Sequence, residues 1–125
     1  MDDVELLDLA AKAYASQDIK KLNFGAWFNG ARGVYWNPLA DDGDALRLAV
    51  KLKIAFFPPE NDEGDFAVAS IAEGVLSDDG DAWIQEWVKG GDKLAATRRA
   101  IVCAAAEIGR ANINDLTPGE PSSNP

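Results

Sequence analysis

The sequence predicts an α+β protein, in which a mostly antiparallel sheet of three to five short strands packs with three helices. Two observations support this: three segments repeat apolar residues at helical spacing, and residues 66–88 follow a period of two on each side of a turn-rich centre. The expected order is α-β-β-α-β-β-β-α. Because 125 residues suffice for one core, we expect a single domain over residues 1–110. Residues 111–125 contain Pro, Ser and Asn and predict a flexible tail.

The first helix is expected to begin at Asp2 or Asp3 and to end near Ser16. Asp2 and Glu5 have the spacing of a capping box. A stripe at intervals of three and four residues predicts the buried face, namely Val4, Leu7, Ala11 and Tyr14.

A short aromatic hairpin is predicted over residues 24–36, after a connection at residues 20–23. The Asn29-Gly30 pair supplies residues that tolerate a positive φ, and aromatic residues favour strands. Pro38 lacks a backbone N–H, so strand pairing is expected to end before it.

The second helix is expected to begin at Asp41 or Asp42 and to end near Lys53, with an acidic first turn that complements the helix dipole. Its predicted apolar side consists of Ala45, Leu46, Leu48, Ala49 and Leu52. Residues 54–57 predict a buried strand, closed by Pro58-Pro59, and residues 60–65 predict an acidic loop.

Two further strands are predicted at residues 66–73 and 82–88, joined by a turn at residues 77–81. In the first strand, period two places Ala67, Ala69, Ile71 and Glu73 on one face, opposite Phe66, Val68, Ser70 and Ala72. In the second it places Trp83, Gln85 and Trp87 together, opposite Ile84, Glu86 and Val88. A short helix over residues 82–88 is the alternative.

The last helix is expected to follow the cap Asp92 and to end near Ile108, with Gly109 as the stop signal. Its predicted apolar side consists of Leu94, Ile101, Val102, Ala104, Ala105 and Ile108. So many alanines predict a close approach to a neighbouring helix or sheet.

The acidic residues are concentrated in the middle of the chain. The net charge is −9, and residues 41–81 carry eleven acidic residues against three basic ones. Such a surface disfavours direct nucleic-acid binding and favours a partner with a basic surface. No apolar run is long enough to span a bilayer, and the acidic N-terminus is unlike a secretory signal. Cys103 is the single cysteine, which fits a reducing cytoplasm.

The residue types needed for catalysis are sparse, so we expect no enzyme, no catalytic residues, no cofactor and no metal. The chain has no histidine, and Cys103 on an alanine-rich helix is expected to be a small buried residue. Asp-Asp-Gly-Asp-Ala occurs at residues 41–45 and 78–82. Clustered carboxylates are ligands for hard cations, but we favour a helix cap for the first copy and a hairpin turn for the second.

Two stretches resemble a known group of proteins. Trp36-Asn37-Pro38-Leu39 with residues 41–49, and Ala95-Ala96-Thr97-Arg98-Arg99 with residues 100–109, resemble small accessory proteins of tailed phages and prophages in the phage α/β/α-sandwich family. The resemblance implies a phage-encoded protein acting in the cytoplasm of an infected bacterium, and it supplies no catalytic residues. Some small acidic phage proteins inhibit host defence components by binding them.

We therefore predict a non-enzymatic accessory protein that binds a host or defence protein with a basic surface, with no nucleic-acid or membrane partner. A structural, virion-associated or homo-oligomeric phage protein is the alternative, followed by a small hydrolase. Tryptophans anchor interfaces but also fill cores. Arg98 and Arg99 are expected to lie on a solvated face of the last helix or to pair with the acidic segment, in preference to forming an anion site. The candidate binding residues are Asp62, Glu63, Asp65, Asp78, Asp79, Asp81, Trp83 and Trp87.

Overall fold

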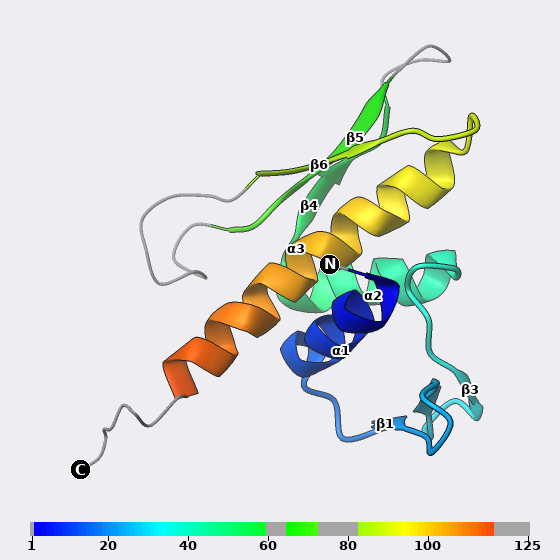
Figure 1. Ribbon diagram of the computed structural model, residues 1–125, viewed down its shortest axis with the longest axis vertical. Coiled ribbons are helices and arrows are strands. Elements are labelled where there is room, and N and C mark those ends of the chain that lie inside the picture. Colours follow the sequence, from blue (N-terminus) through cyan, green and yellow to red (C-terminus); the bar gives the residue numbers. More distant parts are fainter. Residues whose placement is uncertain (1, 60–64, 73–82, 117–125) are drawn as a thin grey trace.

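One long helix lies between a three-stranded sheet and the two other helices (Figure 1). The computed structural model describes residues 2–59, 65–72 and 83–116. In chain order its elements are α1 (Asp3–Tyr14), β1 (Ile19–Lys21), β2 (Trp27–Asn29), β3 (Val34–Tyr35), α2 (Asp42–Leu52), β4 (Ala55–Phe57), β5 (Phe66–Ser70), β6 (Trp83–Trp87) and α3 (Lys93–Leu116). The predicted α+β class is confirmed.

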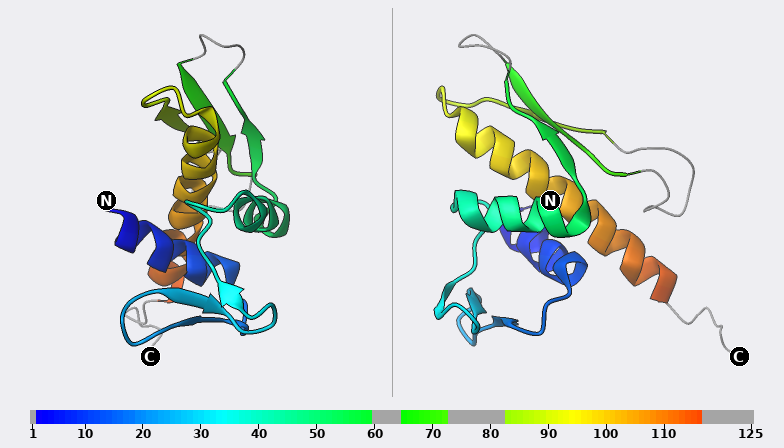
Figure 2. Two further views of the ribbon diagram at one scale, coloured as in Figure 1. Left: turned by 90° about the vertical axis from the view of Figure 1, so that its right-hand side faces the viewer. Right: turned by 180° about the vertical axis from the view of Figure 1, so that it is seen from behind.

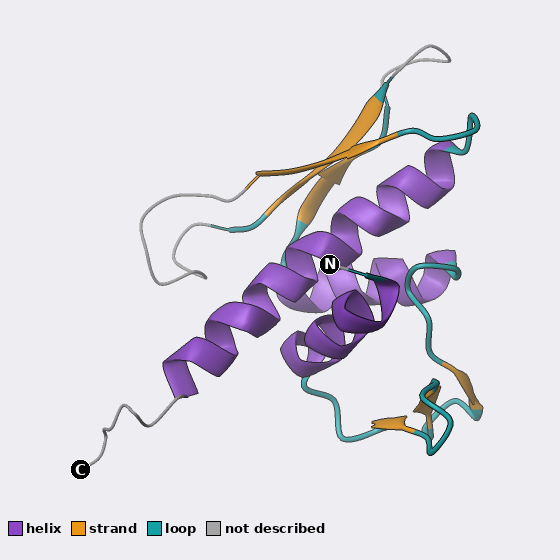
Figure 3. Cartoon of the chain, in the orientation of Figure 1, coloured by secondary structure: helices purple, strands orange, loops and turns teal. Residues whose placement is uncertain are grey.

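The described strands divide between two antiparallel sheets, ordered β1-β2-β3 and β4-β5-β6 (Figure 3). The predicted aromatic hairpin is confirmed as β2 and β3, in which Phe28 pairs with Tyr35. The predicted connection at residues 20–23 is wrong at its start, because Lys20 and Lys21 belong to β1 and pair with β2. Ile19 is the buried residue of that strand, and a single apolar residue gives no recognisable strand pattern.

The helix starts follow the sequence closely. In α1 the Asp2 carboxylate accepts a hydrogen bond from the Glu5 N–H at 2.9 Å, and the reciprocal bond completes the predicted capping box. In α2 the Asp41 carboxylate accepts from the Asp44 N–H at 2.8 Å, which confirms Asp41 as the cap.

Three large apolar residues predicted to be buried are exposed instead: Val4, Leu46 and Leu94. On α1 the buried residues are Leu6, Ala10, Ala11 and Ala13, because α3 packs against the side of α1 that carries small residues. Of the predicted face, Ala11 is therefore buried as expected. Apolar spacing identified an apolar side of each helix, but the neighbouring helix decides which part of that side is buried.

Gly109 does not end α3, so the prediction of a helix stop there is wrong. It lies where α3 crosses α1, and a Cβ at this position would overlap the carbonyl oxygen of Leu9. The absence of a side chain therefore permits the close approach of the two helices. Residues 117–125 lie outside the described residues.

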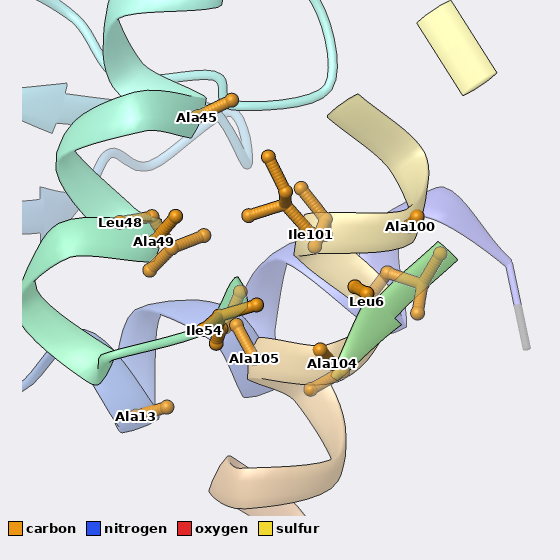
Figure 4. Close-up of a cluster of buried hydrophobic side chains, with 14 of the residues drawn as sticks. Leu6, Ala13, Ala45, Leu48, Ala49, Ile54, Ala100, Ile101, Ala104 and Ala105 are labelled. Atoms are coloured by element: carbon orange, nitrogen blue, oxygen red, sulfur yellow. The ribbon is translucent and has the colours of Figure 1, made fainter. Parts of the chain in front are cut away.

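The core lies on both sides of α3. Figure 2 shows from two further directions that α3 has the β4–β6 sheet on one side and the other helices on the opposite side. Between α1, α2 and α3 it contains Leu6, Leu48, Ile54, Ile101 and Ala105 (Figure 4). On the opposite side of α3, the inner faces of β5 and β6 cover the helix, and Ala67, Ala69 and Ile71 are completely buried. The predicted shared face is thus confirmed for these three residues, while Glu73, also predicted for it, lies outside the described residues.

Candidate functional site

The outer face of the β4–β6 sheet points away from α3, and no element in the described part of the chain covers it (Figure 2). We call this the outer sheet face, and it consists of Ala55, Phe57, Phe66, Val68, Ser70, Trp83, Gln85 and Trp87. Its large aromatic residues are strongly exposed, at 53% for Phe57, 39% for Phe66, 65% for Trp83 and 58% for Trp87. An exposed apolar group of this kind is a common mark of a binding surface.

The strand register places these aromatic residues near both ends of the face. Phe66 pairs with Trp87, and their rings meet edge to face with centroids 5.5 Å apart. Ser70 pairs with Trp83 at the other end of β6. Since a strand rises about 3.3 Å per residue, the Cα atoms of the two tryptophans lie roughly 13 Å apart. The face therefore offers two separate aromatic anchor points.

The outer sheet face carries no charged residue along the three described strands. The one charged residue of β6, Glu86, points inward to α3. Its carboxylate lies 3.4 Å from Arg99 Nε and 3.4 Å from the Cys103 Sγ. The outer sheet face is therefore uncharged, with Ser70 and Gln85 as its polar residues, in a protein whose net charge is −9.

Cys103 is poorly suited to act as a nucleophile. Burial, followed by the neighbouring Glu86 carboxylate, raises the pKa of its thiol to about 12. The reactive form of cysteine is the thiolate, which this environment disfavours near neutral pH. Cys103 is only partly buried, so the prediction of a small buried residue holds in part.

The backbone of β6 forms an edge of its sheet. The Val88 N–H donates to the Asp65 carbonyl at 2.7 Å. Because the backbone groups of successive strand residues point alternately to the two sides, the N–H and C=O groups of Ile84 and Glu86 also point toward β5. The N–H and C=O groups of Trp83, Gln85 and Trp87 consequently point away from β5. Within residues 2–59, 65–72 and 83–116, no backbone group pairs with them.

The structure brings only part of the predicted binding set together. Trp83 and Trp87 share the exposed face, which settles their position outside the core and rules out the alternative helix over residues 82–88. Asp65 is exposed beside Phe66. Asp62, Glu63, Asp78, Asp79 and Asp81 lie outside the described residues, as does the second Asp-Asp-Gly-Asp-Ala copy.

Phe57 and Phe66 belong to the face but were missed. The apolar run at residues 54–57 predicted a fully buried strand, and this is wrong because Ala55 and Phe57 are exposed while Ile54, just before the strand, is buried. Phe66 did alternate with Ala67 in the sequence. That alternation signalled a shared face with Val68, but not which face α3 would cover.

The first acidic cluster has a structural role. The buried Asp44 carboxylate accepts from the Asn37 N–H at 2.9 Å and from Arg47 at 2.7 Å, and Arg32 lies 3.8 Å away. Arg98 bonds to Asp42 at 2.6 Å, as predicted for pairing with the acidic segment. In the described part of the chain, Arg99 pairs with Asp3 and Glu86 and not with the acidic segment.

Besides an open hollow of about 370 Å³ beside β1, lined partly by Lys20 and Phe28, the described residues form two more hollows that are open and largely apolar. One of about 280 Å³ lies between α1 and the β1–β3 sheet and is lined partly by Phe24, Trp27 and Tyr35. The other, of about 230 Å³, lies between α2 and α3, where the charged groups Asp42 and Arg98 already pair with each other. Neither hollow brings together a nucleophile and a base from the described residues.

No protein-family model, curated protein or solved structure matches this chain. In the part of the chain that the structure describes, no helix has the length and apolar character needed to cross a bilayer. Across those same residues, acidic and cysteine side chains do not gather in threes at distances suited to a metal ion.

Proposed function

We propose that this protein is a non-enzymatic accessory protein that binds another protein through its outer sheet face. The main support is that four large aromatic residues are exposed on an uncharged sheet face of a strongly acidic chain. Tryptophan is enriched among the residues that dominate binding energies, and exposed apolar faces of this kind favour association.

The net charge of −9 and the exposed Asp65 beside Phe66 support a partner with a basic surface. The proposal includes the biological role that the sequence resemblance implies, a phage-encoded protein that inhibits a host or defence component in the bacterial cytoplasm. Only the resemblance supports that part of the proposal.

Retention of a partner by the tagged protein tests the proposal. The double variant Trp83→Ser with Trp87→Ser removes both anchor points, whereas Val50→Ser removes an equally exposed apolar residue from α2 as a matched control. We expect a protein retained from bacterial lysate by the wild type and by Val50→Ser to be lost from the double variant. Equal retention by all three proteins would contradict the proposed face.

A homo-oligomer or virion-associated protein built through the same tryptophans is the second candidate. Self-association would bring two chains of charge −9 together, which like-charge repulsion opposes. Sedimentation of the purified protein separates the candidates. A wild-type dimer that is absent when both tryptophans are replaced would favour the homo-oligomer.

A further inference from the structure

We infer that the partner binds as an added β-strand along the open edge of β6, and that this strand is an extended segment rich in lysine or arginine. This inference rests on the proposed function and specifies how the partner is held. It follows from the open backbone groups of β6, from a comparison with the other described sheet edges, and from the acidic residues in the segments that join the strands of this sheet in the sequence.

The edge of β6 differs from the other sheet edges. Natural proteins protect their edges by keeping them short or by placing lysine or proline on them. The β1 edge carries Lys20 and Lys21, β3 has only two residues, and β4 has three followed by Pro58-Pro59. The β6 strand has five residues, with neither lysine, arginine nor proline among them. It is the longest edge among the described strands, and its one inward-pointing charge, Glu86, is already paired with Arg99.

The same residues carry the open backbone groups and the exposed side chains. At Trp83, Gln85 and Trp87 the N–H and C=O groups point to the edge, and the side chains lie on the outer sheet face. A strand added here would gain ladder hydrogen bonds from its backbone. Every second side chain of the added strand would lie beside Trp83 and Trp87, where apolar or β-branched residues pack well.

Charge decides between a second copy of this chain and a basic partner. The segments that join the strands of this sheet in the sequence, residues 58–65 and 71–82, each carry four acidic residues and no basic one. Two copies paired through β6 would each contribute these eight carboxylates to one assembly, and their repulsion disfavours pairing. A segment with basic residues has the complementary charge, so a cationic strand is the favoured occupant.

Peptide binding followed by fluorescence anisotropy tests the inference. The probe is a labelled peptide of about ten residues that alternates lysine with valine, a length that covers β6 and a residue or two beyond each end. One comparison peptide replaces lysine with glutamate. A second keeps the lysines but is N-methylated at alternate peptide bonds, so that it cannot donate ladder hydrogen bonds. We expect the cationic peptide to bind and each comparison peptide to bind at least about tenfold more weakly, which corresponds to about 1.4 kcal/mol.

Position 85 offers a matched pair of protein variants. Gln85→Pro removes an N–H that points to the edge and takes no part in the β5–β6 ladder, so the sheet can still form. Gln85→Thr changes the side chain but keeps that N–H. We expect Gln85→Pro to weaken binding of the cationic peptide at least about tenfold and Gln85→Thr to change it less than about twofold.

Equal affinity for the methylated and unmethylated cationic peptides would overturn strand addition, and this comparison uses the wild-type protein alone. Failure of the cationic peptide to bind, or equal binding of the glutamate peptide, would overturn the cationic occupant. A wild-type dimer that dissociates in the Gln85→Pro variant would also overturn the cationic occupant. In each case the proposed function is judged separately, by whether the Trp83 and Trp87 double variant loses the retained protein.

Discussion

The two three-stranded sheets of this protein use their tryptophans in opposite ways. Around the β1–β3 sheet, Trp36 is only 2% exposed and stacks on Tyr14 of α1 with ring centroids 5.7 Å apart. Trp27 meets Trp36 edge to face and donates from Nε1 to the Asp8 carboxylate at 3.1 Å. On the β4–β6 sheet, Trp83 and Trp87 are mostly exposed, and Trp87 contacts Phe66 of its own exposed face.

The difference follows from what packs against each sheet. Residues of α1 meet the tryptophans of the first sheet and its flanks, so those rings contribute to the core. The second sheet receives α3 on its inner face only, so its tryptophans remain on the surface. The role of an aromatic residue here depends on the neighbouring element, and the second sheet is the better candidate for binding.

Trp36→Ala should produce the largest effect, because it removes a buried ring with two aromatic neighbours. We expect the free energy of unfolding to fall by about 3–5 kcal/mol, the usual cost of truncating a buried aromatic residue. Urea denaturation measures this loss. A loss below about 1 kcal/mol would remove the distinction between the two sheets.

Gly109→Ala tests how the first sheet is held to the rest of the molecule, since α1 precedes that sheet and packs on α3 at Gly109. The new Cβ would overlap backbone atoms of Leu9, so we expect a loss of about 3 kcal/mol in the free energy of unfolding. Gly43→Ala is the matched control. Its Cβ would meet only the ends of the Arg47 and Asp41 side chains, which can move. Equal effects of the two changes would contradict the tight crossing.

Asp44→Asn should have an intermediate effect. The buried Asp44 carboxylate joins α2 to Asn37, in the chain that leaves the first sheet, and loss of its charge weakens hydrogen bonds to Asn37 and Arg47. We expect thermal and urea unfolding to report a loss of about 2 kcal/mol. Asp18→Asn makes the same charge change at an exposed position and should alter stability by less than about 0.5 kcal/mol. A similar loss in both variants would show that net charge, and not the buried contact, is responsible.

Trp83→Ala should have the smallest effect on folding, although it removes the same ring as Trp36→Ala. Because the side chain is mostly exposed, we expect the free energy of unfolding to change by less than about 0.5 kcal/mol. Urea denaturation under the same conditions gives the direct comparison. A loss above about 1.5 kcal/mol would assign Trp83 to the core and weaken the case for the outer sheet face.

The sequence predicted local features well and three-dimensional neighbours poorly. The capping box of Asp2 and Glu5 and the Asp41 cap depend on residues close in the chain, and both are confirmed. The alternation at residues 66–70 and 83–87 separated the two faces of β5 and β6 correctly. Which of these faces would be covered depends on the position of α3, which no local pattern contains.

The same reasoning explains the errors on the helices. Val4 and Leu94 lie at apolar spacing but remain exposed, because α1 and α3 meet instead through alanines and Gly109. A glycine inside a helical pattern normally weakens the helix, so it was interpreted as a stop. Here its lack of a side chain is required by a helix one hundred residues earlier in the chain, at Leu9.

That separation between Leu9 and Gly109 also affects the order in which the chain acquires its structure during synthesis. The ribosome makes α1 first, yet its main packing partner is the last element, α3. The contact between Leu9 and Gly109 cannot form until residue 109 has been added and released. The close crossing of α1 and α3 is therefore among the last contacts of α1 to be completed.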